Sequence, residues 1–92
     1  MTRFRSKKWL AAVREEACII CGSPYTVAHH VRFTTPAAMS LKVPDDMTVP
    51  LCDMHHKELH AHGNEHRWWA LQGVDPEEWI KQFKKTATDL KR

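Results

Sequence analysis

The sequence predicts a small α+β domain in which two short strands are followed by a helix, braced by zinc knuckles and flanked by N- and C-terminal helices. Two observations lead to this fold class. Cysteine and histidine recur at metal-ligand spacing, with Cys18-x-x-Cys21 followed later by Cys52-x-x-His55. Strand-forming residues fill the middle of the chain, whereas helix-capping residues and helical apolar spacing mark both ends. The 92 residues suit one domain over residues 1–92.

Local signals place the elements of the first half of the chain. The apolar residues before Ala17 share one helical face, which predicts a helix that runs to about Ala17. Ser6 is suited to cap the start of this helix. Gly22 and Pro24 mark a tight turn at the first knuckle. The elements that follow the helix are a turn over residues 18–24, a strand over 25–33, a proline-containing loop over 34–46 and a second strand over 47–51.

The second half is predicted to be helical over residues 54–62, over 65–72 and from Pro76 onward. Glu78 is expected to reach back to the start of the last helix and complete a capping box. The expected caps and stops are Asp53 and Asp75 before helices, and Gly63 and Gly73 after them. The apolar stripe of the last helix comprises Trp79, Phe83, Ala87 and Leu90.

Composition excludes several classes of protein. The longest apolar runs are far too short to span a membrane, and no apolar segment follows the basic N-terminus as in a signal peptide. Three cysteines with Cys-x-x-Cys spacing indicate zinc ligation in a reducing compartment, so we expect a cytoplasmic protein. Two basic clusters can neutralise phosphates, or can simply be solvated helix faces. They comprise Arg3, Arg5, Lys7, Lys8 and Arg14 near the start, and Lys81, Lys84, Lys85, Lys91 and Arg92 near the end.

The two knuckles predict one closed, structural zinc site. Cys18 and Cys21 straddle a short turn, so both sulfur atoms can reach one ion, and Cys52 and His55 repeat that spacing at the start of a helix. Such an ion contributes folding free energy directly, which suits a domain of this size. The alternative is that Cys18 and Cys52 are buried apolar residues and that His55 is an exposed helix residue.

The remaining histidines predict a second, open metal site. His56 and His60 lie one helical turn apart on the same face, and His29 is the expected third ligand from the first strand. Three protein ligands leave positions for water and substrate. His30 is then free to act as a general base, although neighbours in a regular strand point to opposite faces, so both can serve one site only where the strand ends, bends or bulges. A competing pair, His62 and His66, is separated by a helix-breaking glycine.

These residues resemble a known family. Cys-x-x-Cys, then Ala-His-His, then Val-Pro-Leu-Cys-x-x-His-His-x-x-x-His is similar to the HNH endonucleases of the His-Me finger (ββα-metal) superfamily. The resemblance is greatest to the small zinc-stabilised phage- and prophage-type members, which include the Ref-like recombination nucleases. It covers about residues 4–79 and implies a ββα-metal core, DNA as substrate and a recombination or repair protein as a partner.

The resemblance assigns roles by position. It implies that His30 is the general base, that His29, His56 and His60 hold a catalytic metal, and that the four knuckle residues hold structural zinc. Met47 stands where the family has an Asn that orients the base. Asp46 or a backbone carbonyl is a possible substitute, and if the position weakens catalysis, Met47→Asn should raise activity.

In the mechanism that the resemblance implies, the histidine-bound metal stabilises charge on the phosphate while His30 accepts a proton from the attacking water. Arg32 and Lys57 lie next to these groups in sequence and are expected to hold flanking phosphates. Three imidazoles favour zinc, nickel or manganese over magnesium.

Two other functions fit parts of the sequence. A non-catalytic zinc-binding nucleic-acid module would explain Met47. A protein-interaction domain would use the tryptophans Trp9, Trp68, Trp69 and Trp79, of which Trp9 and Trp79 suit a core. Trp68 and Trp69 are adjacent in a helix, so we expect one of them to be exposed.

Overall fold

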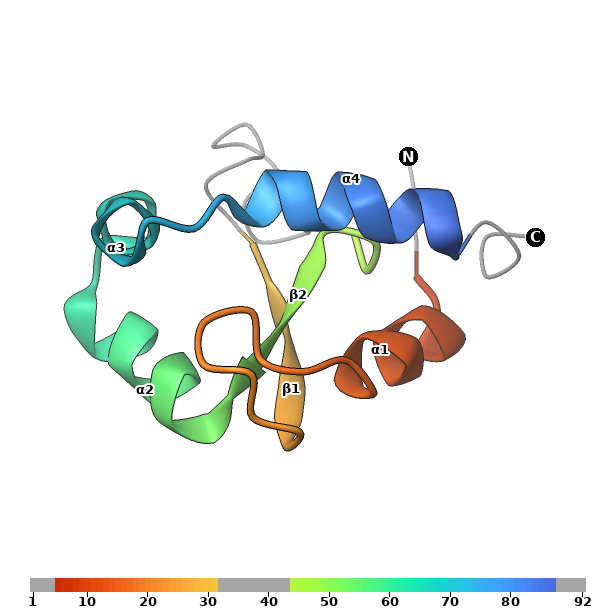
Figure 1. Cartoon of the computed structure of the whole chain (residues 1–92), viewed down its shortest axis with the longest axis horizontal. Helices are drawn as coiled ribbons and strands as arrows, with labels where there is room; N and C mark the ends of the chain where they lie inside the picture. The colour runs from red at the N-terminus through yellow and green to blue at the C-terminus, as the bar shows by residue number, and fades with distance from the viewer. Residues whose placement is uncertain (1–4, 32–43, 88–92) are drawn as a thin grey trace.

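The strands and helices follow one another in the expected order. The computed structural model describes residues 5–31 and 44–87, and these residues form an α+β fold with a two-stranded antiparallel sheet and four helices (Figure 1). The α+β class is therefore confirmed. The elements in chain order are α1 (Lys7–Arg14), β1 (Thr26–His30), β2 (Thr48–Cys52), α2 (Asp53–His62), α3 (Glu65–Gln72) and α4 (Pro76–Thr86).

The two strands form a ribbon that carries both His29 and His30. Thr26 pairs with Cys52 at one end and His30 pairs with Thr48 at the other, with regular antiparallel register between them. Helices α1 and α2 each pack against both strands, α4 packs against β2, and α3 packs against α2. In Figure 1, α1 and α2 lie on opposite sides of the ribbon. The ribbon thus presents one face to α2 and the other to α1.

Tryptophan side chains fill much of the core. Trp9 and Trp68 are each 1% exposed and Trp69 is 2% exposed, so the expectation that Trp68 or Trp69 would be exposed is wrong. The Trp68 indole donates to Glu58 on α2 at 3.2 Å, while the Trp69 indole donates to Glu65 of its own helix at 3.1 Å. The indoles of Trp68 and Trp69 thus each have a polar partner for the buried N–H group.

Most of the expected helix boundaries are confirmed. The Ser6 hydroxyl accepts a hydrogen bond from the amide of Trp9 at 3.0 Å, and the Asp75 carboxylate accepts from the first turn of α4. Gly63 and Gly73 end α2 and α3 with φ angles of 81° and 68°, a left-handed conformation that glycine adopts without a Cβ clash.

Two cap details are wrong. The cap of α2 is Cys52, whose sulfur accepts from the amide of His55 at 3.5 Å, so Asp53 is already the first helical residue. The Glu78 side chain accepts from Gln82 one turn later instead of reaching back, because an i, i+4 neighbour on the same face offers an amide donor.

Helix α1 ends at Arg14, three residues before the expected end. The Thr26 hydroxyl lies 3.1 Å from the carbonyl oxygen of Arg14 and 2.9 Å from that of Glu16, so the strand side chain supplies the partner that a further helical turn would have supplied. Ala17 is exposed. The predicted strand end at residues 32–33, the loop over 34–43 and Leu90 lie outside the described residues. Within the described part, no helix is long and apolar enough to cross a membrane.

Candidate metal centres

The four knuckle residues lie together as the spacing predicts. The turn after α1 brings Cys18 and Cys21 to one side, because the Gly22 amide donates to the Cys18 carbonyl at 2.9 Å and Gly22 has a φ angle of 77°. Cys52 ends β2 and His55 lies in the first turn of α2. The donor atoms of the four side chains all lie within 4.8 Å of one another, so this cluster can hold a metal ion.

The spacing of the donor atoms matches a tetrahedral site. The sulfur atoms of Cys21 and Cys52 are 3.8 Å apart. A zinc–sulfur distance near 2.3 Å at the tetrahedral angle implies about 3.8 Å between sulfurs and about 3.6 Å between sulfur and nitrogen. His55 Nδ1 lies 3.9 Å from the Cys18 sulfur and 3.2 Å from the Cys52 sulfur, values that bracket the second figure. A donor set of three sulfurs and one nitrogen at these distances fits zinc.

The pKa of the Cys18 thiol is lower than that of an ordinary cysteine. Burial raises the pKa of the Cys18 thiol, but backbone hydrogen bonds at Cys21, Cys52 and Ile20 outweigh burial and lower that pKa from 9.0 to about 6. Burial raises the pKa of Cys52 instead. Since the thiolate is the form that binds metal, Cys18 offers the first charged ligand near neutral pH.

The second cluster lies between β1 and α2. His56 and His60 lie one turn apart on α2, and their Nε2 atoms are 3.0 Å apart. The His29 ring from β1 faces both, with ring centroids 5.2 Å and 5.7 Å away. One donor atom from each of the three residues lies within 4.8 Å of the others, so they can hold a second metal ion.

The geometry and protonation of this cluster suit a metal. Two nitrogen ligands about 2.0–2.1 Å from one tetrahedral ion lie about 3.3–3.4 Å apart, close to the separation of the His56 and His60 nitrogens. Burial, together with the neighbouring His29 and His60, lowers the pKa of His56. The neutral ring, which is the form that binds metal, is therefore favoured.

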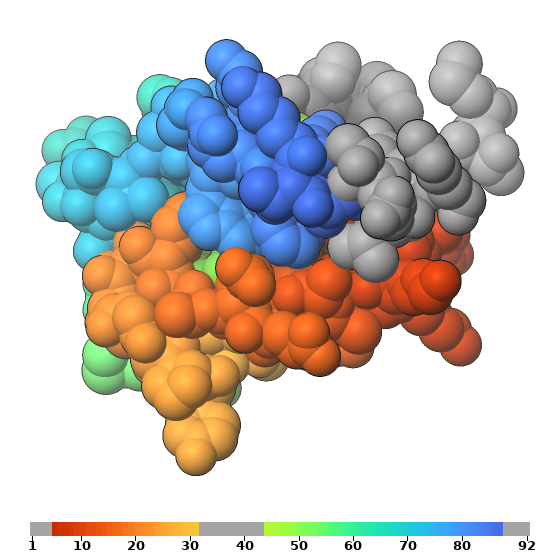
Figure 2. Space-filling model, turned by 45° about the vertical axis from the view of Figure 1, so that its right-hand side comes forward, coloured from red at the N-terminus to blue at the C-terminus, as the bar shows by residue number. Residues whose placement is uncertain are grey.

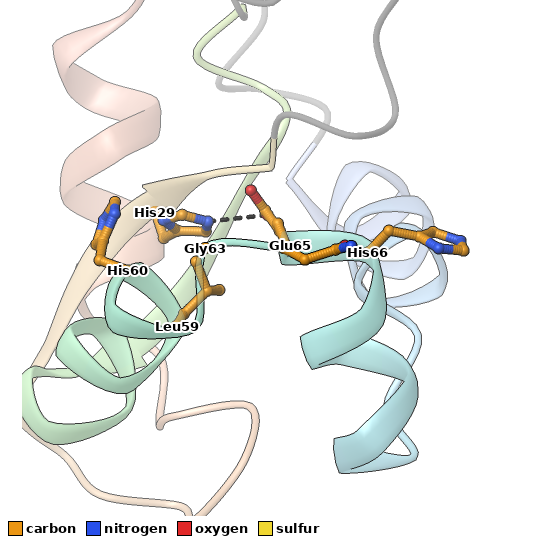
Figure 3. Close-up of a pocket in the computed structure, with 7 residues that line it drawn as sticks. His29, Leu59, His60, Gly63, Glu65 and His66 are labelled. Atoms are coloured by element: carbon orange, nitrogen blue, oxygen red, sulfur yellow. Dashed lines mark hydrogen bonds and ion pairs between the residues drawn. The ribbon is translucent and has the colours of Figure 1, made fainter.

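An open pocket lies beside the histidine cluster. It has a volume of about 540 Å³ and is lined by His29, Leu59, His60, Gly63, Asn64, Glu65 and His66 (Figure 3). In Figure 3 the His29 ring lies between His60 and the Glu65 carboxylate, while His66 points away from them. The Glu65 Oε2 atom is 3.0 Å from His29 Nε2. Glu65 was not among the predicted site residues, because it lies on α3 and is not part of the Cys-x-x-Cys, Cys-x-x-His or His-x-x-x-His spacings.

His30 lies apart from the three clustered histidines. Register is regular through His30, so its ring and that of His29 point to opposite faces of the ribbon. The His30 Nε2 atom lies 2.9 Å from Oδ1 of Asp45, whose other carboxylate oxygen accepts from the Ser6 amide at 2.8 Å. Strand β1 ends at His30. A strand end is one of the places where the rings of two neighbouring residues, here His29 and His30, can reach the same site.

The carboxylate that contacts His30 is that of Asp45 and not that of Asp46. Asp46 instead forms an ion pair with Lys84 of α4, with 3.5 Å between Oδ2 and Nζ. Met47 is half-buried, and its sulfur lies 3.8 Å from the same Lys84 amine. Asp46 was the expected substitute for the Asn side chain, but the residue that contacts His30 is its neighbour Asp45. The turn before β2 directs Asp45 toward β1 and Asp46 toward α4.

The expected phosphate-binding residues lie in different situations. Lys57 is 75% exposed and forms a surface ion pair with Asp53 at 3.1 Å, a contact worth little in water. Arg32 lies outside the described residues. The competing histidines His62 and His66 are both exposed, and only His66 borders the pocket.

The fold and its two donor clusters define a small α+β protein that can hold metal ions. The chain belongs to a family described as a protein of unknown function (DUF968), whose model matches residues 1–90. It is similar to the uncharacterized protein YdfU of Escherichia coli (strain K12), with 34% identity over 59 residues. That match covers 64% of this chain but only 17% of YdfU. No solved structure matches the chain.

Proposed function

We propose that this protein is a metal-dependent endonuclease of the HNH type that hydrolyses phosphodiester bonds in DNA. The observation that carries the proposal is the convergence of His29, His56 and His60 beside an open pocket. The order β1–β2–α2 around this cluster agrees with a ββα-metal core. Three imidazole ligands leave coordination positions for a substrate oxygen, which is the requirement for reactive metal sites.

The cysteine cluster is proposed to hold structural zinc. Three sulfurs and one nitrogen at tetrahedral spacing favour zinc over harder ions. Bound there, zinc would join the turn after α1 to the junction between β2 and α2. Because His55 and His56 are neighbours on α2, the same ion would fix the helix that carries two of the three histidine ligands.

The chain supplies the groups that hydrolysis needs. A divalent metal held by the three histidines supplies charge stabilisation for the phosphate in the transition state. His30 accepts the proton of the attacking water, and its ring is 31% exposed and therefore accessible. Asp45 has a 9% exposed side chain and holds the His30 ring through Nε2, so Nδ1 is the nitrogen left to accept that proton.

The alternation of side chains sets where the substrate lies. His29 and His30 are on opposite faces, and His30 is the last residue of β1. A phosphodiester that crosses the end of this strand meets both rings, whereas one bound over the middle of either face meets a single ring. The proposed scissile phosphate therefore lies at the end of β1.

The proposal is tested by cleavage of supercoiled plasmid. Protein treated with a chelator that strips the histidine site is supplied with Zn²⁺, Ni²⁺, Mn²⁺ or Mg²⁺ one at a time. Cleavage is expected to return with at least one of these ions. Cleavage that persists in the chelator, or that returns with none of the ions, would contradict the proposed activity.

Met47→Asn tests whether catalysis depends on the position that an Asn occupies in the HNH endonucleases. With Asp45 already in contact with His30, the added amide is expected to leave the single-turnover cleavage rate unchanged. The measurement compares parent and variant under saturating metal and DNA. A clear gain in rate would mean that Asp45 does not orient His30 adequately, and that Met47 is the weak position.

DNA binding is proposed to rely on basic residues that the fold gathers. Helices α1 and α4 contact each other through Trp9 and Phe83, whose ring centroids are 5.3 Å apart. Figure 2 shows the two helices side by side on one face, so the basic residues of α1 and α4 share that face although the helices are far apart in sequence. Exposed lysines on these helices, such as Lys8 and Lys85, can then contact one duplex.

Lys57→Ala is expected to weaken binding of a short duplex and to reduce the slope of log affinity against log salt by roughly one. The physical reason is the loss of one phosphate contact beside the histidine cluster. Asp53→Asn is the matched control, since it releases Lys57 from its ion pair and should not weaken binding. Parent affinity that does not depend on salt would sink the phosphate-binding proposal.

One alternative is a protein with the same fold and metal sites that binds nucleic acid but does not cleave it. Met47 in place of the usual Asn favours a zinc-binding nucleic-acid module that does not cleave. Such a module would bind duplex with salt-dependent affinity and would leave plasmid intact with every metal, whereas the nuclease cleaves it.

A further inference from the structure

Glu65 belongs to neither metal-ligand set, yet it contacts the most buried of the histidines. It is the first residue of α3, directly after the Asn64 cap. Its Oε2 atom lies 3.0 Å from His29 Nε2 and 3.1 Å from Trp69 Nε1, and its side chain is 13% exposed. His29 is 4% exposed. One carboxylate oxygen thus joins a strand imidazole to the indole of a helix that carries no metal ligand.

We propose that Glu65 is a positioning residue that decides which nitrogen of His29 binds the second metal. The Glu65 carboxylate is the acceptor in this 3.0 Å contact, so the His29 ring donates to it from Nε2. The lone pair is then on Nδ1 alone. His29 binds the metal through Nδ1, whereas His56 and His60, whose Nε2 atoms face each other at 3.0 Å, bind it through Nε2.

Burial makes this assignment firm. The His29 residue is only 4% exposed, and Glu65 is itself held by Trp69. Figure 3 shows the ring with Glu65 on one side and His60 on the other, which is the arrangement a ring needs to donate from one nitrogen and bind metal with the other. Carboxylates that hold a metal-binding imidazole in this way typically change metal affinity by about 10–100-fold.

The inference rests on the histidine metal site of the proposed function but not on cleavage. Its test is a calorimetric titration of Co²⁺ into protein that retains one zinc per chain. Glu65→Gln keeps the shape of the side chain and removes its charge, and it is expected to weaken Co²⁺ binding by about 10–100-fold. The retained zinc should stay at one per chain, because Glu65 lies outside the cysteine cluster.

Glu58→Gln is the matched control. Glu58 accepts from the Trp68 indole at 3.2 Å, the same kind of carboxylate–indole contact, but none of the clustered histidines shares its carboxylate. It is expected to bind Co²⁺ as the parent does. A loss of affinity in both variants would assign the effect to the packing of α3 and would overturn the positioning role.

A spectroscopic signature completes the test. Long-range proton–nitrogen NMR spectra of the metal-free parent are expected to show His29 in the tautomer protonated at Nε2, and Glu65→Gln should weaken that preference, because its amide can also present a donor to the ring. An Nδ1-protonated His29, parental Co²⁺ affinity in Glu65→Gln, or the absence of any second metal in the parent would each overturn the inference. A parent that binds the second metal as described but never cleaves DNA would refute the nuclease alone.

Discussion

Replacing Cys21 with serine is expected to release the metal of the cysteine cluster and to lower the melting temperature by more than about 15 °C. The sulfur of Cys21 lies 3.8 Å from that of Cys52, and the cluster joins the turn after α1 to the start of α2. A loss of about three orders of magnitude in zinc affinity would remove about 4 kcal/mol of stability. For a small domain that is a large part of the whole.

The exposure of Cys21 makes this test sharp. Cys21 is exposed, whereas Cys18 and Cys52 are buried, so its replacement by serine leaves no cavity in the core. Without a bound metal, an exposed change of this kind alters stability by no more than about 0.5 kcal/mol. Differential scanning calorimetry with metal analysis gives the measurement. The difference between parent and variant should vanish in a strong chelator, and a variant that melts with the parent in zinc would show that the cluster is not a structural site.

The largest expected effect on activity is that of His30→Ala. It should lower the cleavage rate by about two to four orders of magnitude, the usual contribution of a general base. The fold and both metals should remain, because the His30 ring bonds to Asp45 and lies outside both donor clusters. Single-turnover cleavage at saturating metal, with metal content measured in the same sample, separates loss of the base from loss of the metal.

His56→Ala is expected to abolish cleavage for a different reason. It removes one of the three imidazoles, so the second metal should be lost while the metal of the cysteine cluster stays. His62→Ala is the matched control, since His62 is an exposed histidine on the same helix outside both clusters, and its activity should equal that of the parent. If His30→Ala cleaves as fast as the parent, His30 is not the base. If His56→Ala retains two metals, the histidine site is wrongly assigned.

The pairs of residues within each donor cluster could be predicted because they depend on local chain geometry. Cys-x-x-Cys across a turn, a Cys-x-x-His at a helix start and two histidines four residues apart bring their donors together whatever the rest of the chain does. The same holds for the caps at Ser6 and Asp75, where a side chain bonds to an amide two or three residues on. Contacts between residues two to four positions apart can therefore be predicted from the spacing of those residues in the sequence.

Contacts between distant segments were decided only by the tertiary structure. Thr26 ends α1 from twelve residues away, and Asp45 rather than Asp46 meets His30 because of the turn before β2. Glu65 meets His29 across 36 residues. Spacing carries no information about such pairs, since the strand and the helix can pack at many relative positions with the same local sequence. The sequence by itself determined which side chains can bind metal, and the packing of α1, α3 and the ribbon decided which carboxylates hold the imidazoles and how each ring is turned.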